Sequence, residues 1–262
     1  MRLEIITRNP KTQSGLTPLL FVHGMFFSAS VWEYFLPYFA EHGYEAHALS
    51  LRGHGASEGH ELLRRIRAAE YVEDVAHVAH ELRASPVLIG HSLGGYIVQK
   101  YLEMYAVPGA VLMASVPPSG MFKMLARQAA RHPWQTLKCH LSRNPSVMIE
   151  TPSLAREVFF SADMPADKVY RYFTRLQNES YWASLDATFF DLPRPGKITR
   201  PPMLVMSGTN DILHSRSEIE ATARAYGAHL EFIPNVAHMM MLEADWMNVA
   251  ERILKWLRNK GL

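Results

Sequence analysis

The chain has 262 residues, of which 48% are hydrophobic and 20% are charged, a globular composition that excludes an intrinsically disordered protein. Its 27 basic and 25 acidic side chains leave a formal charge of +2, and the basic residues are spread along the chain. Nucleic acid is therefore not expected as a partner. The length suits one domain that carries an embellishment.

The single cysteine, Cys139, excludes an internal disulfide and forms no metal-binding or redox pair by itself. Residues 1–7 lack the apolar run of a signal peptide, and no stretch approaches the roughly 18 apolar residues of a membrane-spanning helix. We therefore expect a cytoplasmic protein with no integral membrane association. The sequence carries no signal for the oligomeric state.

Short apolar runs alternate with amphipathic stretches as far as residue 114. The predicted strands lie at residues 2–7, 19–22, 44–49, 86–90 and 110–114. The predicted helices between them lie at residues 68–83 and 94–105. Near-continuous apolar strands separated by helices are typical of a parallel sheet whose two faces are both covered.

The alternation stops after residue 114, and residues 118–196 show a helical pattern broken by prolines. Strand patterns return at residues 203–207 and 230–233, and a helical pattern at residues 246–257 closes the chain. The predicted fold class is α/β, with a mostly parallel sheet of seven or eight strands flanked by helices. Its core lies at residues 1–117 and 197–262, and residues 118–196 form an inserted helical cap.

The pentapeptide Gly90-His91-Ser92-Leu93-Gly94 has the pattern G-x-S-x-G and lies between an apolar run and a helical stretch. A strand that turns at once into a helix forces Ser92 into a strained, accessible conformation, and the two glycines leave room around it. A glycine-bounded turn is the alternative interpretation. The flanking strand and helix favour a nucleophile elbow, with Ser92 as the nucleophile.

Further motifs follow in the same order as in one known superfamily. They are His23-Gly24 with Trp32 downstream, Arg52-Gly53-His54-Gly55-Ala56-Ser57, Gly208-Thr209-Asn210-Asp211, and His238 with Glu243 five residues later. Over essentially its whole length the chain resembles the α/β-hydrolase superfamily, and most closely the capped serine esterases and the lysophospholipase-like or monoacylglycerol-lipase-like hydrolases. The resemblance implies that the catalytic groups occur in the order Ser, Asp or Glu, His.

A serine hydroxyl attacks only when a base takes its proton, and the base needs a carboxylate to hold its tautomer. Asp211 follows the predicted strand at residues 203–207, and residues 115–117, after the preceding strand, offer no carboxylate. His238 follows the last predicted strand and is the expected base. His214 is the rival base, and capping a helix or contacting solvent is the simpler interpretation of its position.

The resemblance implies an oxyanion hole made by the backbone N–H groups of Met25 and Leu93. Such donors face charge that appears only in the transition state. Phe26 and Phe27 follow Met25 where some relatives have a glycine-rich loop, so bulky tertiary-alcohol esters are not the expected substrates. The predicted cap is rich in large apolar residues, among them Phe160 and Trp182.

We expect these two residues, with Phe26 and Phe27, to bind a lipophilic small-molecule ester such as a monoacylglycerol or lysophospholipid. No cofactor is expected, because residues 52–55 lack the spacing of a phosphate-binding loop. No metal is expected either, since His77 and His80 form the only candidate pair and are interpreted as surface or second-layer residues.

Two groups of alternative functions stay open. An acyltransferase, a thioesterase or a cofactor-free C–C hydrolase would use the same triad, and a ligand-binding receptor would use the same scaffold. Halide- and epoxide-processing relatives use a carboxylate nucleophile, so Ser92 argues against both of those activities.

Overall fold

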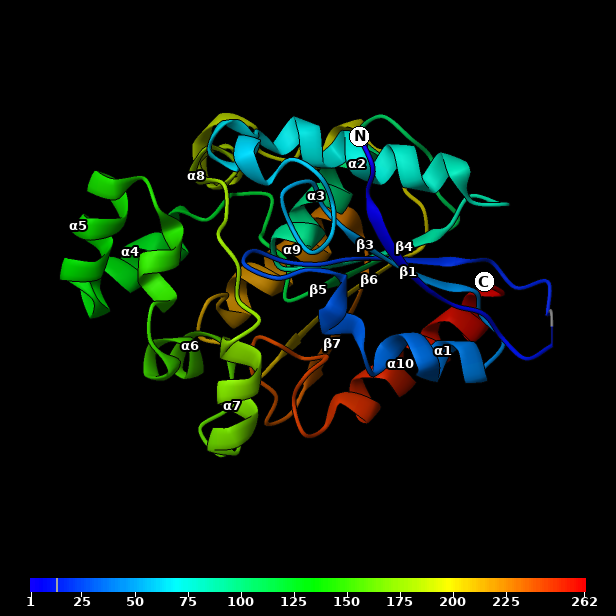
Figure 1. Ribbon diagram of the computed structural model, residues 1–262. Helices are drawn as coiled ribbons and strands as arrows, with labels where there is room; N and C mark the ends of the chain where they lie inside the picture. Colours follow the sequence, from blue (N-terminus) through cyan, green and yellow to red (C-terminus); the bar gives the residue numbers. More distant parts are fainter. Residues whose placement is uncertain (13) are drawn as a thin grey trace.

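The computed structural model describes residues 1–12 and 14–262, and its centre is a single twisted sheet (Figure 1). The strands are β1 (Glu4–Arg8), β2 (Leu19–Val22), β3 (Ala46–Ser50), β4 (Val87–His91), β5 (Ala110–Met113), β6 (Met203–Gly208) and β7 (His229–Ile233). They form a seven-stranded sheet in the order β1-β3-β2-β4-β5-β6-β7. β1 pairs antiparallel with β3, and all other neighbours run parallel. The predicted α/β class and mostly parallel sheet are confirmed.

Helices cover both faces of the sheet. They are α1 (Phe35–Glu41), α2 (Ala68–Glu81), α3 (Leu93–Leu102), α9 (Arg216–Tyr226) and α10 (Trp246–Lys260). Leu19 and Phe21 of β2 pack into a core with α1 and α10, while Leu20 and Val22 pack into a second core with α2, α3 and α9. All four residues are fully buried, which explains why this strand is apolar at every position.

The observed ends of the elements differ from the predicted ones by a few residues. α3 ends at Leu102, not at Tyr105, because the N–H groups of Met104 and Tyr105 both bond the Tyr101 carbonyl in a closing turn. β3 begins at Ala46 because Tyr44 is still held by α1, where its N–H bonds the Phe39 carbonyl. Such end turns have no strong sequence signature.

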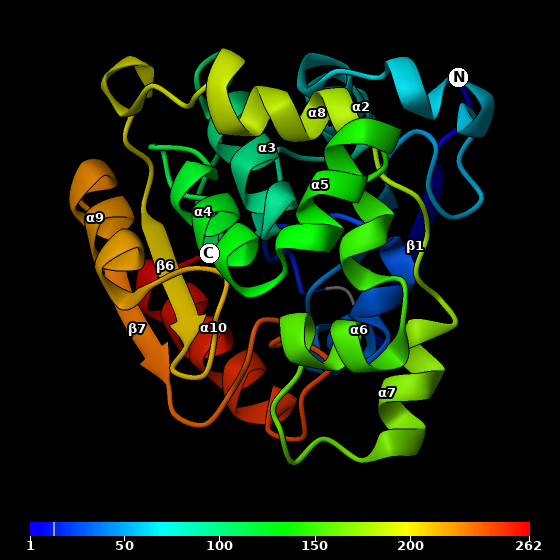
Figure 2. The same ribbon diagram turned by 90° about the vertical axis from the view of Figure 1, so that its left-hand side faces the viewer.

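The segment between β5 and β6 contains helices and, within the described residues, no strand. Its helices are α4 (Phe122–Arg131), α5 (Pro133–Ser142), α6 (Pro152–Phe159), α7 (Ala166–Phe173) and α8 (Tyr181–Leu185). Pro133 and Pro152 occupy the first turn of α5 and α6, where a missing N–H costs nothing. Figure 2 looks onto these helices: α4 and α5 lie in the middle of the view, α8 runs along the top, and α6 and α7 lie below.

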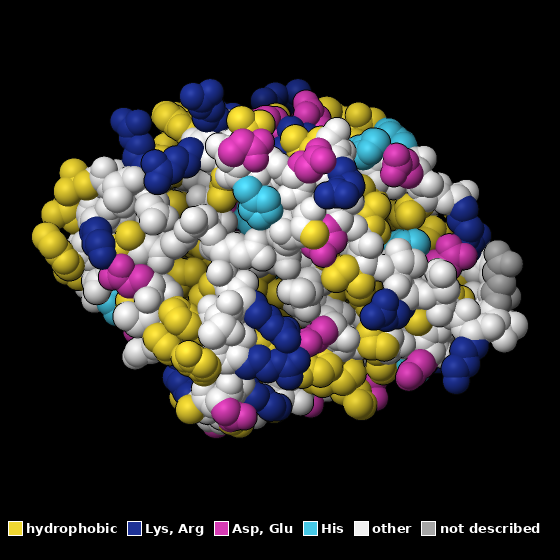
Figure 3. All heavy atoms as spheres, viewed as in Figure 1, with side chains coloured by type: hydrophobic (Ala, Val, Ile, Leu, Met, Phe, Trp, Pro, Cys, Tyr) yellow, Lys and Arg dark blue, Asp and Glu magenta, His cyan; other side chains and the backbone are white. Residues whose placement is uncertain are grey.

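Short helical turns complete the structure. They are η1 (Ala29–Trp32), η2 (His60–Arg65), η3 (Pro145–Ile149) and η5 (Pro195–Lys197), with the π-helical turn η4 (Asp186–Phe190). No helix among the described residues is long and apolar enough to span a bilayer. Figure 3 shows hydrophobic side chains on the surface at the left end of the molecule, where α4 and α5 lie. On α5, Trp134, Leu137 and Leu141 are exposed.

Candidate active site

Ser92 occupies the junction between β4 and α3 with φ 53° and ψ −117°, a conformation that is rare for a residue with a side chain. The predicted strand, turn and helix are all present around it. A Cβ on Gly90 would lie 2.5 Å from the Gly94 carbonyl oxygen, and a Cβ on Gly94 would collide with the Val22 carbonyl. Both glycines are therefore required by the close approach of neighbouring backbone, which lets the tight turn form.

The structure brings His238 and Asp211 together from the loops that follow β7 and β6. The Nδ1–H of His238 donates to Oδ2 of Asp211 at 3.0 Å, and both side chains are almost completely buried. Oδ1 of Asp211 accepts a hydrogen bond from the Leu213 N–H at 2.8 Å. Because Nδ1 is the donor, Nε2 of His238 is the acceptor nitrogen, as a general base requires.

The Asp211 carboxylate is ionised throughout the neutral pH range. Burial alone would raise its pKa, but His238, through charge and a hydrogen bond, and His214 and the Leu213 N–H lower the pKa to about 2. A permanently charged carboxylate at this position orients the imidazole and stabilises an imidazolium.

Ser92 and His238 line the same cavity, whose volume is about 110 Å³. Met25, Phe26 and Phe27 line it as well. Phe26 has φ 68°, so the loop after β2 bends sharply beside Ser92.

The N–H groups of Met25 and Leu93 are available as donors. Leu93 is the first residue of α3, and its N–H has no acceptor within the helix. Among the backbone hydrogen bonds of the described residues, none uses the N–H of Met25 or Leu93. Leu93 directly follows Ser92, and Met25 lies in the loop that faces the Ser92 turn. This is the arrangement expected of an oxyanion hole.

His91 fixes the loop that carries His238, a role that the sequence analysis missed. Its Nε2–H donates to the His238 carbonyl at 3.0 Å, and the two rings lie 4.8 Å apart. Burial, reinforced by the nearby His238, holds the pKa of His91 well below its ordinary value, so the ring is neutral. The sequence shows a histidine inside the elbow, but it does not predict this hydrogen bond, because His238 lies far along the chain from His91.

Phe160 and Trp182, which the sequence suggested as substrate-binding residues, do not line the cavity. Phe160 is buried and stacks on Tyr172 with ring centroids 5.5 Å apart. Trp182 lies at the surface, where the Arg67 guanidinium sits 5.6 Å from its ring. The aliphatic, proline and phenylalanine side chains of the segment between β5 and β6 that do line the cavity are Met121, Met124, Leu125, Pro145, Met148, Ile149, Val158, Phe159 and Leu185.

His214 differs from its expected place at a helix end or in solvent. Its side chain is only 3% exposed, it lines the cavity, and its ring centroid lies 5.7 Å from that of His238. Ser215, not His214, caps α9. Burial, opposed in part by the Asp211 carboxylate, lowers the pKa of His214 to about 4, so this imidazole is neutral at pH 7.

No group of three or more His, Cys, Asp or Glu side chains within residues 1–12 and 14–262 has the geometry to hold a metal ion. His77 is exposed and lies 3.3 Å from Glu81, one turn further along α2.

The chain belongs to the α/β hydrolase family, because the model of that family matches residues 19–252. A non-heme chloroperoxidase of Streptomyces lividans is 40% identical over 111 residues, which cover 38% of this chain and 37% of that protein. The chain thus matches little more than a third of the length of this curated relative.

Solved structures share the fold over nearly the full length. An esterase from Exiguobacterium antarcticum has a TM-score of 0.75 at 19% identity, covering 98% of this chain and 95% of that one. The monoacylglycerol lipase of Paleococcus ferrophilus has a TM-score of 0.72 at 18% identity, covering 99% of this chain and 100% of that one. At these identities the likeness establishes the architecture alone.

Proposed function

We propose that the protein is a serine hydrolase that cleaves a carboxylic ester of a lipophilic small molecule through an acyl-enzyme. One observation carries the proposal. Ser92 in a strained turn and His238, tied to the ionised Asp211, open onto the same apolar cavity. Ser92 is the proposed nucleophile, His238 the base and Asp211 the acid.

In this mechanism Oγ of Ser92 attacks the ester carbonyl while its proton passes to Nε2 of His238. The N–H groups of Met25 and Leu93 stabilise the oxyanion, and loss of one such donor typically costs about a hundred- to thousandfold in rate. The imidazolium then protonates the departing alcohol. Water repeats the sequence on the acyl-enzyme and releases the carboxylic acid.

We further propose that residues 118–196 act as a cap that encloses the substrate. The support is that side chains of α4, α5 and α6 complete the cavity wall above Ser92, among them Met124, Cys139 and Val158. No Lys, Arg, Asp or Glu side chain of the described residues lines the cavity. A neutral lipophilic ester therefore suits it better than a charged one.

Labelling with an organophosphonate, read by intact mass, tests the nucleophile directly. Wild type should gain one adduct and hydrolyse a chromogenic butyrate ester, and Ser92→Ala should do neither while remaining folded. Ser184→Ala is the matched control. This serine also lines the cavity, but its hydroxyl donates to the Tyr181 carbonyl at 2.7 Å, so the adduct should still form. An unlabelled wild type, or a labelled Ser92→Ala, would refute the proposal.

A further inference from the structure

Gln128 on α4 is a polar residue buried in the wall of a mostly apolar cavity. Its side chain is only 6% exposed, and its Oε1 atom has no hydrogen-bond partner in the described part of the chain. A buried amide oxygen without a partner destabilises a fold, so such groups call for an explanation. One explanation is a ligand that supplies the missing hydrogen-bond donor.

His214 lines the same cavity and shares this property, since its buried Nδ1 also lacks a partner among the described residues. Apart from Ser92, the hydroxyl groups in the described wall are hydrogen-bonded within the protein. Thr136 donates to the His132 carbonyl at 2.9 Å, and the Tyr181 hydroxyl lies 2.9 Å from Nδ1 of His140. Nδ1 of His91 also lacks a partner among the described residues, but His91 belongs to the elbow beside Ser92. Outside the elbow and the proposed triad, Gln128 and His214 are the wall residues with an unpartnered buried polar atom in the described part of the chain.

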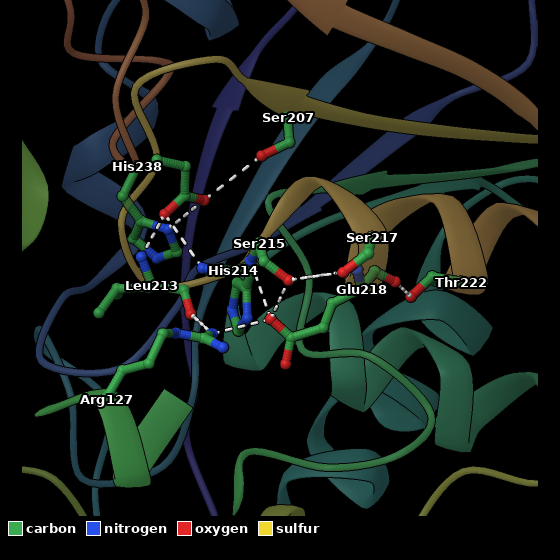
Figure 4. A network of polar contacts seen from close by, with 10 residues as sticks. Arg127, Ser207, Leu213, His214, Ser215, Ser217, Glu218, Thr222 and His238 are labelled. Carbon is green, nitrogen blue, oxygen red and sulfur yellow. Dashed lines mark hydrogen bonds and ion pairs between the residues drawn. The ribbon is translucent and has the colours of Figure 1, made fainter. Parts of the chain in front are cut away.

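A partly buried ion pair holds these two residues on facing segments. The guanidinium of Arg127, the neighbour of Gln128 on α4, donates to the Leu213 carbonyl and to Oε2 of Glu218 at 2.8 Å. Figure 4 shows His214 between this pair and His238. Because the His214 ring centroid lies 5.7 Å from that of His238, a group bound at His214 would lie beside the proposed base.

We propose that Gln128 and His214 form a polar subsite that binds a neutral hydroxyl group of the substrate beside the ester bond. The proposal rests on the proposed esterase function and narrows it to hydroxylated esters. A hydroxyl can donate to one of these groups and accept from the other. A charged group would be buried without a counter-charge, because the described lining contains no Lys, Arg, Asp or Glu and His214 is neutral at pH 7.

The hydroxyl belongs either to the alcohol, as in a glycerol monoester, or to the acid, as in a hydroxyacyl ester. Two matched pairs of esters separate these sources: glycerol monobutyrate against propyl butyrate, and ethyl 3-hydroxybutyrate against ethyl butyrate. We expect wild type to prefer the hydroxylated member of one pair in kcat/KM by at least about tenfold.

Gln128→Met keeps the length of the side chain and removes its polar atoms. It should bring the preferred ratio close to one, chiefly through KM, and His214→Phe should lower it as well. Thr136→Val is the matched control, because its hydroxyl is already bonded within the protein, and it should leave the ratio unchanged. Gln128→Met should melt no lower than wild type, since it removes an unpaired buried group.

A wild-type preference for the unhydroxylated member of both pairs, or ratios unchanged in Gln128→Met, would overturn the subsite. Binding can be measured without turnover in the inactive Ser92→Ala variant. The measurement compares the rise in melting temperature caused by glycerol monobutyrate or ethyl 3-hydroxybutyrate with the rise caused by the unhydroxylated ester of the same pair. If the hydroxylated ester stabilises Ser92→Ala more than its unhydroxylated counterpart, while wild type shows no turnover and no phosphonate adduct, the subsite is supported and the proposed function is refuted. If wild type hydrolyses all four esters with equal kcat/KM, the proposed function is supported and the subsite is refuted.

Discussion

Nε2 of His54 lies 3.4 Å from Oε2 of Glu179, and both side chains are completely buried. The pair joins the turn after β3 to the segment before α8. Oε1 of Glu179 accepts a hydrogen bond from the Tyr71 hydroxyl at 2.7 Å. Burial alone would lower the pKa of His54, but the Glu179 carboxylate raises it above 6.5. Burial would raise the pKa of Glu179, but His54 and the hydrogen bonds lower it below 4.5.

These shifts make stability depend on pH in a definite way. The contribution of His54 is complete below pH 6.5 and is lost as the pH rises through its folded-state pKa. The contribution of Glu179 is complete above pH 4.5 and is lost as the pH falls through its folded-state pKa. The pair should therefore stabilise the fold most between pH 4.5 and pH 6.5.

Urea unfolding at a series of pH values measures this effect. The free energy of unfolding of wild type minus that of a His54→Gln, Glu179→Gln double variant should be largest in that window and should fall at alkaline pH. Glu179→Gln alone leaves a buried imidazole without its counter-charge and should cost about 3 kcal/mol. A difference that does not change with pH would show that the pair is not ionised.

Asp211→Asn should keep the shape of the site but favour the wrong imidazole tautomer of His238. We expect kcat for a simple ester to fall by up to about ten-thousandfold, with a much smaller change in KM. His214→Ala should reduce kcat far less, because the His214 side chain makes no hydrogen bond to Asp211 in the structure. Comparable losses of kcat in the two variants would mean that the acid–base pair is misassigned.

Gly94→Ala should strongly destabilise the protein. A Cβ at this position would collide with the backbone carbonyl groups of Val22, the last residue of β2, and of His23 directly after it, and neither can give way easily. Gly196→Ala is the control, because a Cβ there meets nothing within 4 Å. Thermal unfolding should show a large loss for the first variant and little change for the second. An equally stable Gly94→Ala would contradict the tight elbow.

The preferred length of the acyl chain should depend on the residues that line the cavity, and not on the number of aromatic residues in the segment between β5 and β6. Each methylene that enters the apolar cavity contributes roughly 0.8 kcal/mol, so kcat/KM should rise from acetyl towards longer esters until the cavity is full. Leu125→Ala or Met148→Ala should move the optimum to longer chains, because both residues line the cavity. Trp182→Ala should not, since Trp182 lies outside it. A preference for acetyl esters in wild type would contradict this account.

The sequence by itself determined the sheet and the elbow. Runs such as Leu19, Leu20, Phe21 and Val22 are apolar at every position only when both faces of a strand are covered, so they predict a buried parallel strand. The glycines on either side of Ser92 are there because neighbouring backbone in this tight turn leaves no room for a Cβ. Both signals are local, because neighbouring residues decide them.

Only the tertiary structure decided which side chains form the cavity wall. Phe160 and Trp182 looked equivalent to Phe159 in the sequence, yet Phe159 faces the cavity while the others pack on Tyr172 and Arg67. Likewise the burial of His214 and the pairing of His54 with Glu179 depend on segments distant along the chain. No local pattern encodes such contacts, because burial and partners are set by how whole helices and loops pack against one another.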